Sequence, residues 1–196
     1  MQKTSSNTLA NQKRFKILER TLKKGFKLEF QVAFRILADI PQAQSLMGVT
    51  IDGLRNRPTT IDMIVLVGRT IMVVELKNYT NLLKGDLTGK PWEGRTGSRR
   101  TKISSPINQN MQHSTSLSVA LKKQKIKLRG IRIVDYVVVP DTCVLDIPVE
   151  LQQTVLKESD FLARVQVESL NTGTFIMDEI EEAMKSWAVQ YVKEKD

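Results

Sequence analysis

Residues 61–76 read IDMIVLVGRTIMVVEL, and this stretch decides the fold. Two runs rich in β-branched residues, 61–67 and 70–76, flank the pair Gly68 and Arg69. That pattern predicts two antiparallel strands joined by a two-residue turn. Both runs are apolar on both faces, so we expect the hairpin to lie in the covered centre of a β-sheet.

The register of this hairpin brings three charged side chains together. With a two-residue turn, Val67 faces Thr70 and Asp62 faces Glu75. The β-carbons of directly opposed residues lie roughly 4.5–5.5 Å apart. Lys77 lies two residues beyond Glu75 and therefore shares its face of the strand. Two acids and one lysine are thus predicted to converge at one end of an otherwise apolar hairpin.

The segments on either side predict helices and one more strand. Helical spacing of apolar residues runs from residue 14 to 40, with a break near Gly25, and Pro41 ends it. The other predicted elements are a Gly/Arg/Lys-rich loop over 80–104, a helix from Ser105 to about 125, a buried strand over 131–139, a short helix over 160–170 and a final helix capped by Thr174. We predict an α/β sandwich in which helices flank a mixed central sheet. One domain would span 14–196, with a C-terminal helix, after a flexible basic segment over 1–13.

Composition excludes several classes of protein. Cys143 is the only cysteine, so an internal disulfide and a zinc site built from several cysteines are excluded. No apolar run approaches the roughly 20 residues that cross a bilayer, so we expect no membrane partner. The N-terminus has no apolar secretory segment, so we expect a cytoplasmic location.

The positive charge of the chain is concentrated in sequence. The formal net charge is +9, and residues 90–132 contain eleven Lys and Arg but one acid, Glu93. This distribution favours a polyanionic partner, although a solvated basic surface without a partner is the alternative. The cations that we expect to contact nucleic-acid phosphates are Arg95, Arg99, Arg100 and Lys102, which surround Trp92. Trp92 itself either stacks on a base or anchors its own loop.

The convergent acids indicate metal chemistry. Two neighbouring carboxylates repel, and burial strengthens the repulsion. A divalent cation removes that conflict, and Mg²⁺ takes one or two carboxylates together with phosphate oxygens. We therefore expect Asp62, Glu75 and the Leu76 carbonyl to bind Mg²⁺ or Mn²⁺, and Lys77 to assist phosphodiester hydrolysis. The structural alternative is an ordinary Glu–Lys pair at a strand end.

Five segments together resemble the nuclease-related domain (NERD) family, a branch of the PD-(D/E)xK nuclease superfamily. They are TIDMIVL over 60–66, VVELKNY over 73–79, Trp92, SPINQ over 105–109 and GFKLE over 25–29. The family pattern has an Asp before a strand, then E-x-K-N-[YW], a Trp, and N-P-x-x-Q at the start of a helix. Upstream it has G-x-x-G-E on its first helix. The resemblance covers roughly residues 25–165.

Two positions depart from that pattern. Leu28 stands where the family has its second Gly, and Ser105 replaces the Asn before Pro106. Ser caps helices well, so the second change is easily accommodated. The acid–acid–lysine set is intact, which the resemblance associates with an active site.

The resemblance implies an α/β fold with a restriction-endonuclease-like core. It also implies a metal-dependent nuclease that acts on nucleic acid, with DNA as the expected substrate. It adds Gln109 to the site, at the start of its helix. Glu29 is added on separate grounds, because it shares a helical face with Val32 and Ile36, which should pack on the sheet. The alternative is a non-catalytic nucleic-acid-binding module that works with a partner protein in DNA processing. Oligomeric state stays open at this point.

Overall fold

The computed structural model describes residues 27–53, 57–170, 179–184 and 187. The elements in chain order are α2 (Lys27–Asp39), β1 (Gln44–Asp52), β2 (Pro58–Val67), β3 (Thr70–Leu76), β4 (Leu82–Lys84), β5 (Trp92–Thr96), β6 (Arg99–Ile103), α3 (Pro106–Lys123), β7 (Arg132–Val139), β8 (Val144–Asp146), the 3₁₀ turn η2 (Val149–Leu151), β9 (Val155–Lys157) and α4 (Glu158–Ser169). None of the described helices is both long and apolar enough to cross a membrane.

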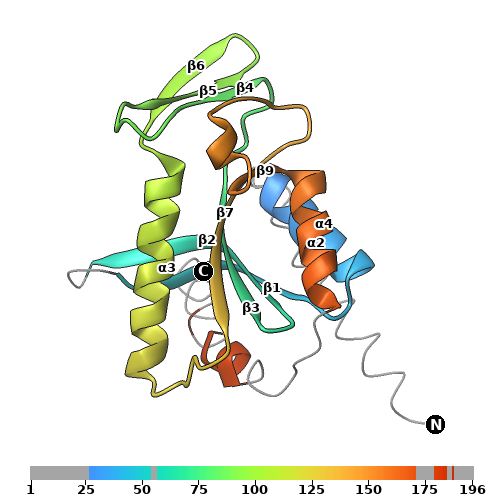
Figure 1. Ribbon diagram of the computed structural model, residues 1–196, viewed down its shortest axis with the longest axis vertical. Helices are drawn as coiled ribbons and strands as arrows, with labels where there is room; N and C mark the ends of the chain where they lie inside the picture. Colours follow the sequence, from blue (N-terminus) through green and yellow to red (C-terminus); the bar gives the residue numbers. More distant parts are fainter. Residues whose placement is uncertain (1–26, 54–56, 171–178, 185–186, 188–196) are drawn as a thin grey trace, which may run out of the picture.

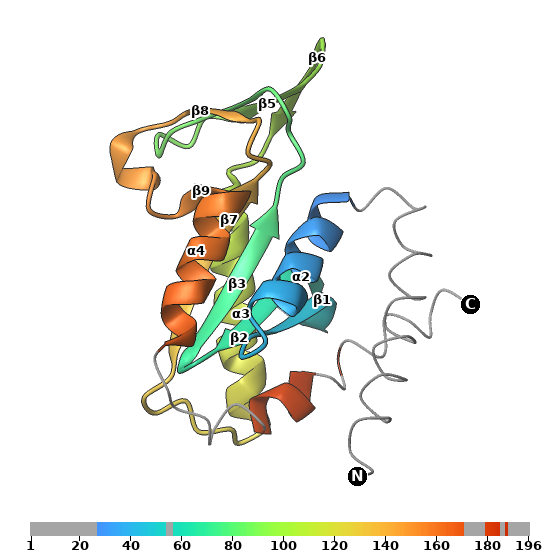
Figure 2. The same cartoon turned by 90° about the vertical axis from the view of Figure 1, so that its right-hand side faces the viewer.

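Among the described residues, the larger of two sheets has five strands in the order β1-β2-β3-β7-β9. Strands β1, β2 and β3 pair antiparallel, whereas β3, β7 and β9 pair parallel, so the sheet is mixed. Helix α3 covers one face, and α2 and α4 cover the other (Figures 1 and 2). The predicted α/β fold, with a mixed central sheet between helices, is confirmed.

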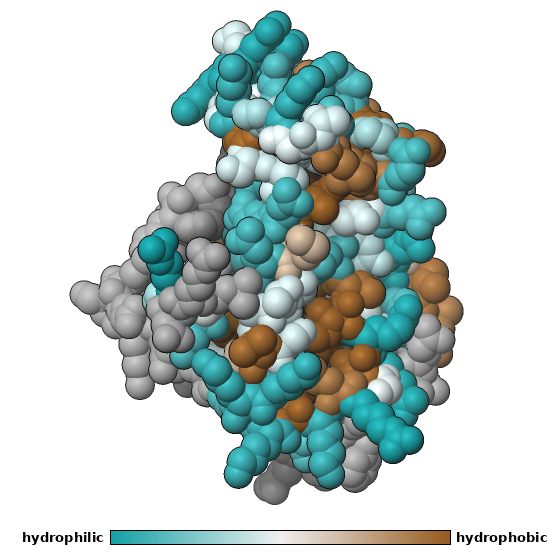
Figure 3. Space-filling model, turned by 60° about the vertical axis from the view of Figure 1, so that its left-hand side comes forward, coloured by the Kyte–Doolittle hydropathy of each residue, from teal (hydrophilic) through white to brown (hydrophobic). Residues whose placement is uncertain are grey.

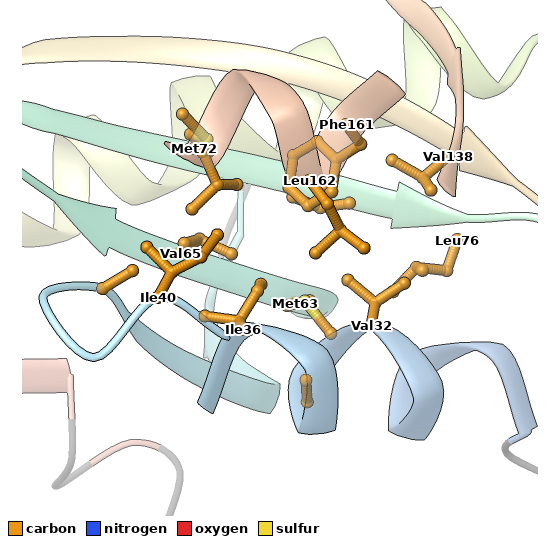
Figure 4. Close-up of a cluster of buried hydrophobic side chains, with 14 of the residues drawn as sticks. Val32, Ile36, Ile40, Met63, Val65, Met72, Leu76, Val138, Phe161 and Leu162 are labelled. Atoms are coloured by element: carbon orange, nitrogen blue, oxygen red, sulfur yellow. The ribbon is translucent and has the colours of Figure 1, made fainter. Parts of the chain in front are cut away.

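Two apolar cores follow from this layering. The first lies between the sheet and the pair α2 and α4, where side chains of both helices point at β2 and β3 (Figure 4). The second lies between the sheet and α3, and residues 179–184, which are helical, contribute Ile180 and Met184 to it. Because apolar side chains leave both faces of β2 and β3, the hairpin is buried from both sides, as its sequence predicts. Residues 1–13, the predicted helical turns before Lys27 and the predicted cap Thr174 lie outside the described residues.

The smaller sheet corrects one prediction and adds a third core. Residues 80–104, predicted as a loop, contain β4, β5 and β6, and with β8 they form a sheet in the order β6-β5-β4-β8. The inward positions of the β5–β6 hairpin include Gly94 and Thr101, so hydrophobic alternation is faint there. Trp92 is fully buried and its indole N–H donates to the Asp86 carbonyl at 3.0 Å, so it anchors this segment and cannot stack on a base.

Two glycines let aromatic rings press directly against the backbone of the smaller sheet. A Cβ on Gly94 would lie 2.4 Å from the ring of Tyr79, and one on Gly85 would lie 2.0 Å from the ring of Trp92. Real Cβ atoms do not come that close, so each ring lies where a side chain would otherwise stand. The apolar cluster around Trp92 includes Val137 and Val139 of β7. The smaller sheet is therefore packed onto the end of the larger one.

One strand was not predicted, and one predicted strand differs in detail. Strand β1 has no clear signal in the sequence, because Gly48 interrupts its apolar pattern. The predicted strand 131–139 is β7, but only its last three residues, Val137 to Val139, are fully buried. The predicted helix that Ser105 begins is α3, and Ser105 caps it by accepting a hydrogen bond from the Asn108 N–H.

Candidate active site

The hairpin register is confirmed and carries Asp62 to the strand of Glu75. The pairs Val67 with Thr70 and Met63 with Val74 mark the two ends of the β2–β3 ladder. One residue beyond that ladder, Asp62 Oδ2 accepts a 2.9 Å hydrogen bond from the Leu76 N–H. The carboxylate of Asp62 is thereby held against the strand that carries Glu75, next to the residue that follows it.

A local twist of the β1–β2 ribbon places Asp62 at a boundary between the two cores. Residues two apart in a strand normally share a face. Here Met47 contacts the core under α2 whereas Val49 lies in the core under α3, and Met63 and Ile61 divide in the same way. Between these residues, Gly48 of β1 has a φ of 60°, which disfavours residues with a β-carbon. At this point the side of each strand that faced one core turns to face the other. Asp62, which lies between Ile61 and Met63, is therefore at the boundary of the two cores.

Glu75 and Lys77 form an ion pair on the α3 side of the sheet. Lys77 Nζ lies 2.6 Å from Glu75 Oε1 and donates to Gln109 Oε1 at 3.3 Å. Glu75 is 1% exposed, whereas Lys77 is partly open. Because Ser105 caps α3, Gln109 falls in its first turn and reaches the lysine. The structure therefore brings together Asp62, Glu75, Lys77 and Gln109, as predicted.

Two buried polar residues of α3, neither of which was predicted from the sequence, complete the site. His113 Nδ1 lies 3.5 Å from Glu75 Oε2, and neither atom has a hydrogen-bond partner among the described residues. Asn110 donates to the carbonyls of Val73 and Tyr136 at 2.8 and 3.0 Å, so it ties α3 to both β3 and β7. The available signal was spacing, because His113 lies one helical turn after Gln109.

Burial and mutual repulsion perturb all the acids of the site. Burial raises the pKa of Glu75 to about 7, and the Asp62 charge adds to the shift while the Lys77 ammonium opposes it. Burial also raises the pKa of Asp62, and the hydrogen bond from Leu76 opposes that shift. Burial lowers the pKa of His113, which favours the neutral imidazole. The site therefore disfavours a full set of negative charges unless a cation offsets them.

Glu29 belongs to the same electrostatic group. It lies in the first turn of α2 and is half-buried. Burial raises the pKa of Glu29 and the Asp62 charge adds to the shift, while Glu29 in turn raises the pKa of Glu75. Leu28, in place of the second glycine of the family pattern, is buried in the core beneath α2. Helix α2 thus approaches closely enough for its carboxylate to act on both site acids.

A comparison with models of protein families shows which family has this arrangement of residues. The model of the nuclease-related domain, NERD, matches residues 24–140, more than half of the chain. The chain belongs to the nuclease-related domain family. The matched NERD region runs from α2 through β7 and so contains every residue of the site. It ends at residue 140 rather than at 165, where the sequence resemblance ended. Comparisons with curated proteins and with solved structures gave no significant match.

The donor set of this NERD site fits a cation held by few protein ligands. Within the described residues, no three His, Cys, Asp or Glu side chains are arranged to hold a metal ion. Mg²⁺ does not need three, because it commonly takes one or two carboxylates and completes its shell with water and phosphate oxygens. Glu75 Oε2 is buried without a hydrogen-bond partner in the described structure, and the adjacent Asp62 repels it. These two carboxylates fit Mg²⁺ or Mn²⁺, and the Leu76 carbonyl stays a predicted third ligand.

The predicted phosphate-binding residues lie on the β5–β6 hairpin of this NERD fold. Glu93 Oε1 lies 3.2 Å from Arg95 and 3.9 Å from Arg100, so one acid partly neutralises two arginines. Arg99 and Lys102 are exposed. Figures 2 and 3 show this hairpin at the outer end of the smaller sheet, on a predominantly hydrophilic surface. The hairpin therefore carries an excess of positive charge at the end of the molecule beyond the N-terminus of α3.

Proposed function

We propose that this NERD protein is a metal-dependent nuclease that hydrolyses phosphodiester bonds of DNA. The observation that carries the proposal is the proximity of Asp62 and Glu75, because Glu75 Oε2 is buried and has no hydrogen-bond partner among the described residues. A structural ion pair would need only Glu75 and Lys77. Asp62, as a second buried acid, adds a repulsion between carboxylates that destabilises the fold without a cation. A divalent cation between the two acids would remove that repulsion.

The residues would divide the chemistry among them. Asp62 and Glu75 would hold Mg²⁺ or Mn²⁺, which supplies positive charge against the negative charge that develops on the phosphate. Lys77, partly open and oriented by Gln109, would place an ammonium beside the scissile phosphate and the attacking water. His113 Nδ1, which lies 3.5 Å from Glu75 Oε2, would help to orient the carboxylate. Glu29 would raise the negative potential that attracts the cation.

A second function is supported by a separate observation. The positive charge on the β5–β6 hairpin lies outside the acid–lysine site, so nucleic acid could be held there without turnover. In that case the protein would act as a nucleic-acid-binding module beside a DNA-processing partner. The two functions differ in one measurable result, which is cleavage.

A cleavage assay tests the proposal. Purified protein is incubated with linear duplex, circular duplex and single-stranded DNA, each with Mg²⁺, with Mn²⁺ or with EDTA. We expect cleavage that requires the metal and that disappears in Glu75→Gln and Lys77→Ala. Glu150→Gln, which removes an exposed carboxylate on η2, is the matched control and should cleave like the wild type. Binding of DNA without cleavage of any form, with either metal, would favour the binding module instead.

A further inference from the structure

A groove lies beside the site, between the smaller sheet and the first turns of α3. Its volume is about 770 Å³. Lys90 and Lys102 lie on its walls with Asn108, Gln109 and Gln112 of α3. Gln109 is also the residue that contacts Lys77, so the groove leads to the catalytic lysine.

The chemistry of the groove suits a phosphodiester backbone. Its lining residues include two lysines, three side-chain amides and two serines but no carboxylate and no aromatic ring. Neither Lys90 nor Lys102 forms an ion pair within the part of the chain that the structure describes. Exposed, unpaired cations bind phosphates, whereas the absence of aromatic rings from the lining leaves no platform on which bases could stack.

A neighbouring cavity on the same sheet shows that this composition is not general. That cavity measures about 590 Å³ and is lined by Asp86, Glu93 and Asp146 as well as by Lys84 and Lys90. Lys84 Nζ lies 2.5 Å from Asp146 Oδ2, so its charge is already neutralised. Lys90 borders both cavities, and its charge helps to lower the pKa of Asp86, after the hydrogen bonds from Thr88. A polyanion would therefore favour the first groove over the second.

We propose that this groove binds the phosphodiester backbone of the nucleic-acid strand that is cleaved, with Lys90 and Lys102 on its phosphates and Asn108 and Gln112 as hydrogen-bonding partners. The proposal rests on the proposed nuclease function. Because the contacts are to the backbone, binding depends strongly on salt and little on base sequence. The strand then continues past Gln109 to Lys77.

Binding is measured by fluorescence anisotropy in EDTA, so that cleavage plays no part. The probes are a labelled single-stranded oligonucleotide and the corresponding duplex. The variants are Lys90→Ala, Lys102→Ala and their combination, and Lys84→Ala is the matched control from the acidic cavity. Each single groove variant should lower affinity about three- to tenfold. It should also reduce the salt slope, which is the fall of log affinity with log salt concentration, by about one, and the double variant should reduce this slope by about two. Lys84→Ala should change neither.

A second variant removes no lysine. Gln112→Glu places a negative charge on the exposed surface of α3 inside the groove, and it should weaken binding, whereas Gln124→Glu, at the other end of α3, should not. Loss of affinity for the single strand alone would identify a single strand as the occupant, and loss for both probes a strand of a duplex. Unchanged affinity and slope in the double variant, or an equal loss in Lys84→Ala, would overturn the proposal.

The groove and the nuclease function fail separately. If the wild type cleaves DNA and the groove variants bind and cleave normally, the proposal that the groove binds the backbone is wrong and the nuclease assignment stands. If the groove variants lose binding but the wild type never cleaves DNA, the groove is a binding site and the nuclease assignment is wrong.

Discussion

The Leu76 N–H donates a 2.9 Å hydrogen bond to Asp62 Oδ2 immediately beyond the last main-chain pair of the β2–β3 ladder, Met63 with Val74. A side chain thus takes over the hydrogen-bonding role of a main-chain carbonyl at the end of the ladder. This contact gives Asp62 two separable roles, one in the sheet and one as a charge. Substitutions that keep the acceptor and remove the charge distinguish them.

We predict that Asp62→Asn and Asp62→Ala both lose Mn²⁺ binding but differ in stability. The Asn side chain keeps a carbonyl oxygen that can accept from Leu76, whereas Ala leaves that N–H without this partner. The Ala variant should be less stable than the Asn variant by about 1–2 kcal/mol, the usual cost of one such loss. Urea denaturation in EDTA measures the difference. Equal stabilities would show that the Leu76 contact is not needed for folding.

For Glu75→Gln we predict loss of cleavage together with a pH-dependent gain in stability without metal. The ordinary pKa of Glu is 4.5, and that of Glu75 in the fold is about 7, so the folded protein resists ionising this group. The penalty is absent below pH 4.5, grows between pH 4.5 and 7, and is complete above pH 7. Gln lacks the charge and still accepts from Lys77.

Thermal or urea unfolding in EDTA should therefore show equal stability of wild type and Glu75→Gln near pH 4. At pH 8 the variant should be more stable by about 3 kcal/mol. Glu150→Gln should show no such trend with pH. A Glu75→Gln variant that is destabilised at every pH would contradict the burial of an unfavourable charge.

Lys77→Ala should separate metal binding from catalysis. The Lys77 ammonium lies 2.6 Å from Glu75 Oε1, so it would repel a metal ion bound to the same carboxylate. The Ala variant lacks this repulsion. We expect cleavage to disappear while Mn²⁺ affinity stays close to that of the wild type or improves. The Lys77 charge lowers the pKa of Glu75, so its loss moves ionisation to higher pH. Calorimetric titration at pH 8.5 is therefore the fair measurement, and loss of Mn²⁺ binding there would contradict the assigned roles.

His113 should act through the Glu75 carboxylate. His113→Leu removes the ring nitrogen that lies 3.5 Å from Glu75 Oε2, whereas His113→Asn retains a donor. Supporting partners of metal ligands change affinity by about 10–100-fold. We expect Mn²⁺ affinity to fall by about tenfold or more in the Leu variant and by less in the Asn variant. If the two variants bind Mn²⁺ as the wild type does, His113 serves only the packing of α3.

The arginines of the β5–β6 hairpin should contribute unequally to binding. Arg95 and Arg100 share Glu93, whereas Arg99 has no ion pair with a described residue. Arg99→Ala should therefore reduce DNA affinity and its salt slope more than Arg95→Ala, and the triple Ala variant should reduce both further. Arg164→Ala, on the exposed side of α4, is the control. An unchanged salt slope in the triple variant would exclude the hairpin as a binding surface.

The sequence predicted those parts of the site whose signals are local. A two-residue turn fixes strand register, so Gly68 and Arg69 were enough to bring Asp62 towards Glu75. Ser105 and Pro106 likewise fixed the start of α3, and with it the position of Gln109. These predictions needed no knowledge of distant contacts.

The missed features depend on contacts that are distant in sequence. His113 has the ordinary appearance of a helical polar residue, and only the packing of α3 on β3 places it beside Glu75. The β5–β6 hairpin has charged outward positions and a glycine at a buried one, so its strands carry little apolar alternation. The exchange of faces at Gly48 becomes visible only once β1 is paired with β2, because the glycine alone does not tell which core each neighbour enters.

The Tyr79 ring packs directly on the backbone of Gly94. This contact connects the site around Lys77, which would act in cleavage, to the β5–β6 hairpin, which would bind the nucleic acid. Tyr79 follows Lys77 by two residues, and Gly94 lies in the strand that carries Arg95. The direct contact of this ring with the Gly94 backbone couples the position of the hairpin to that of the lysine. The span between the phosphates gripped by the hairpin and the phosphate at Lys77 would then be constant. A strand held in this way would be cut at a constant distance along its backbone from the place where the hairpin holds it.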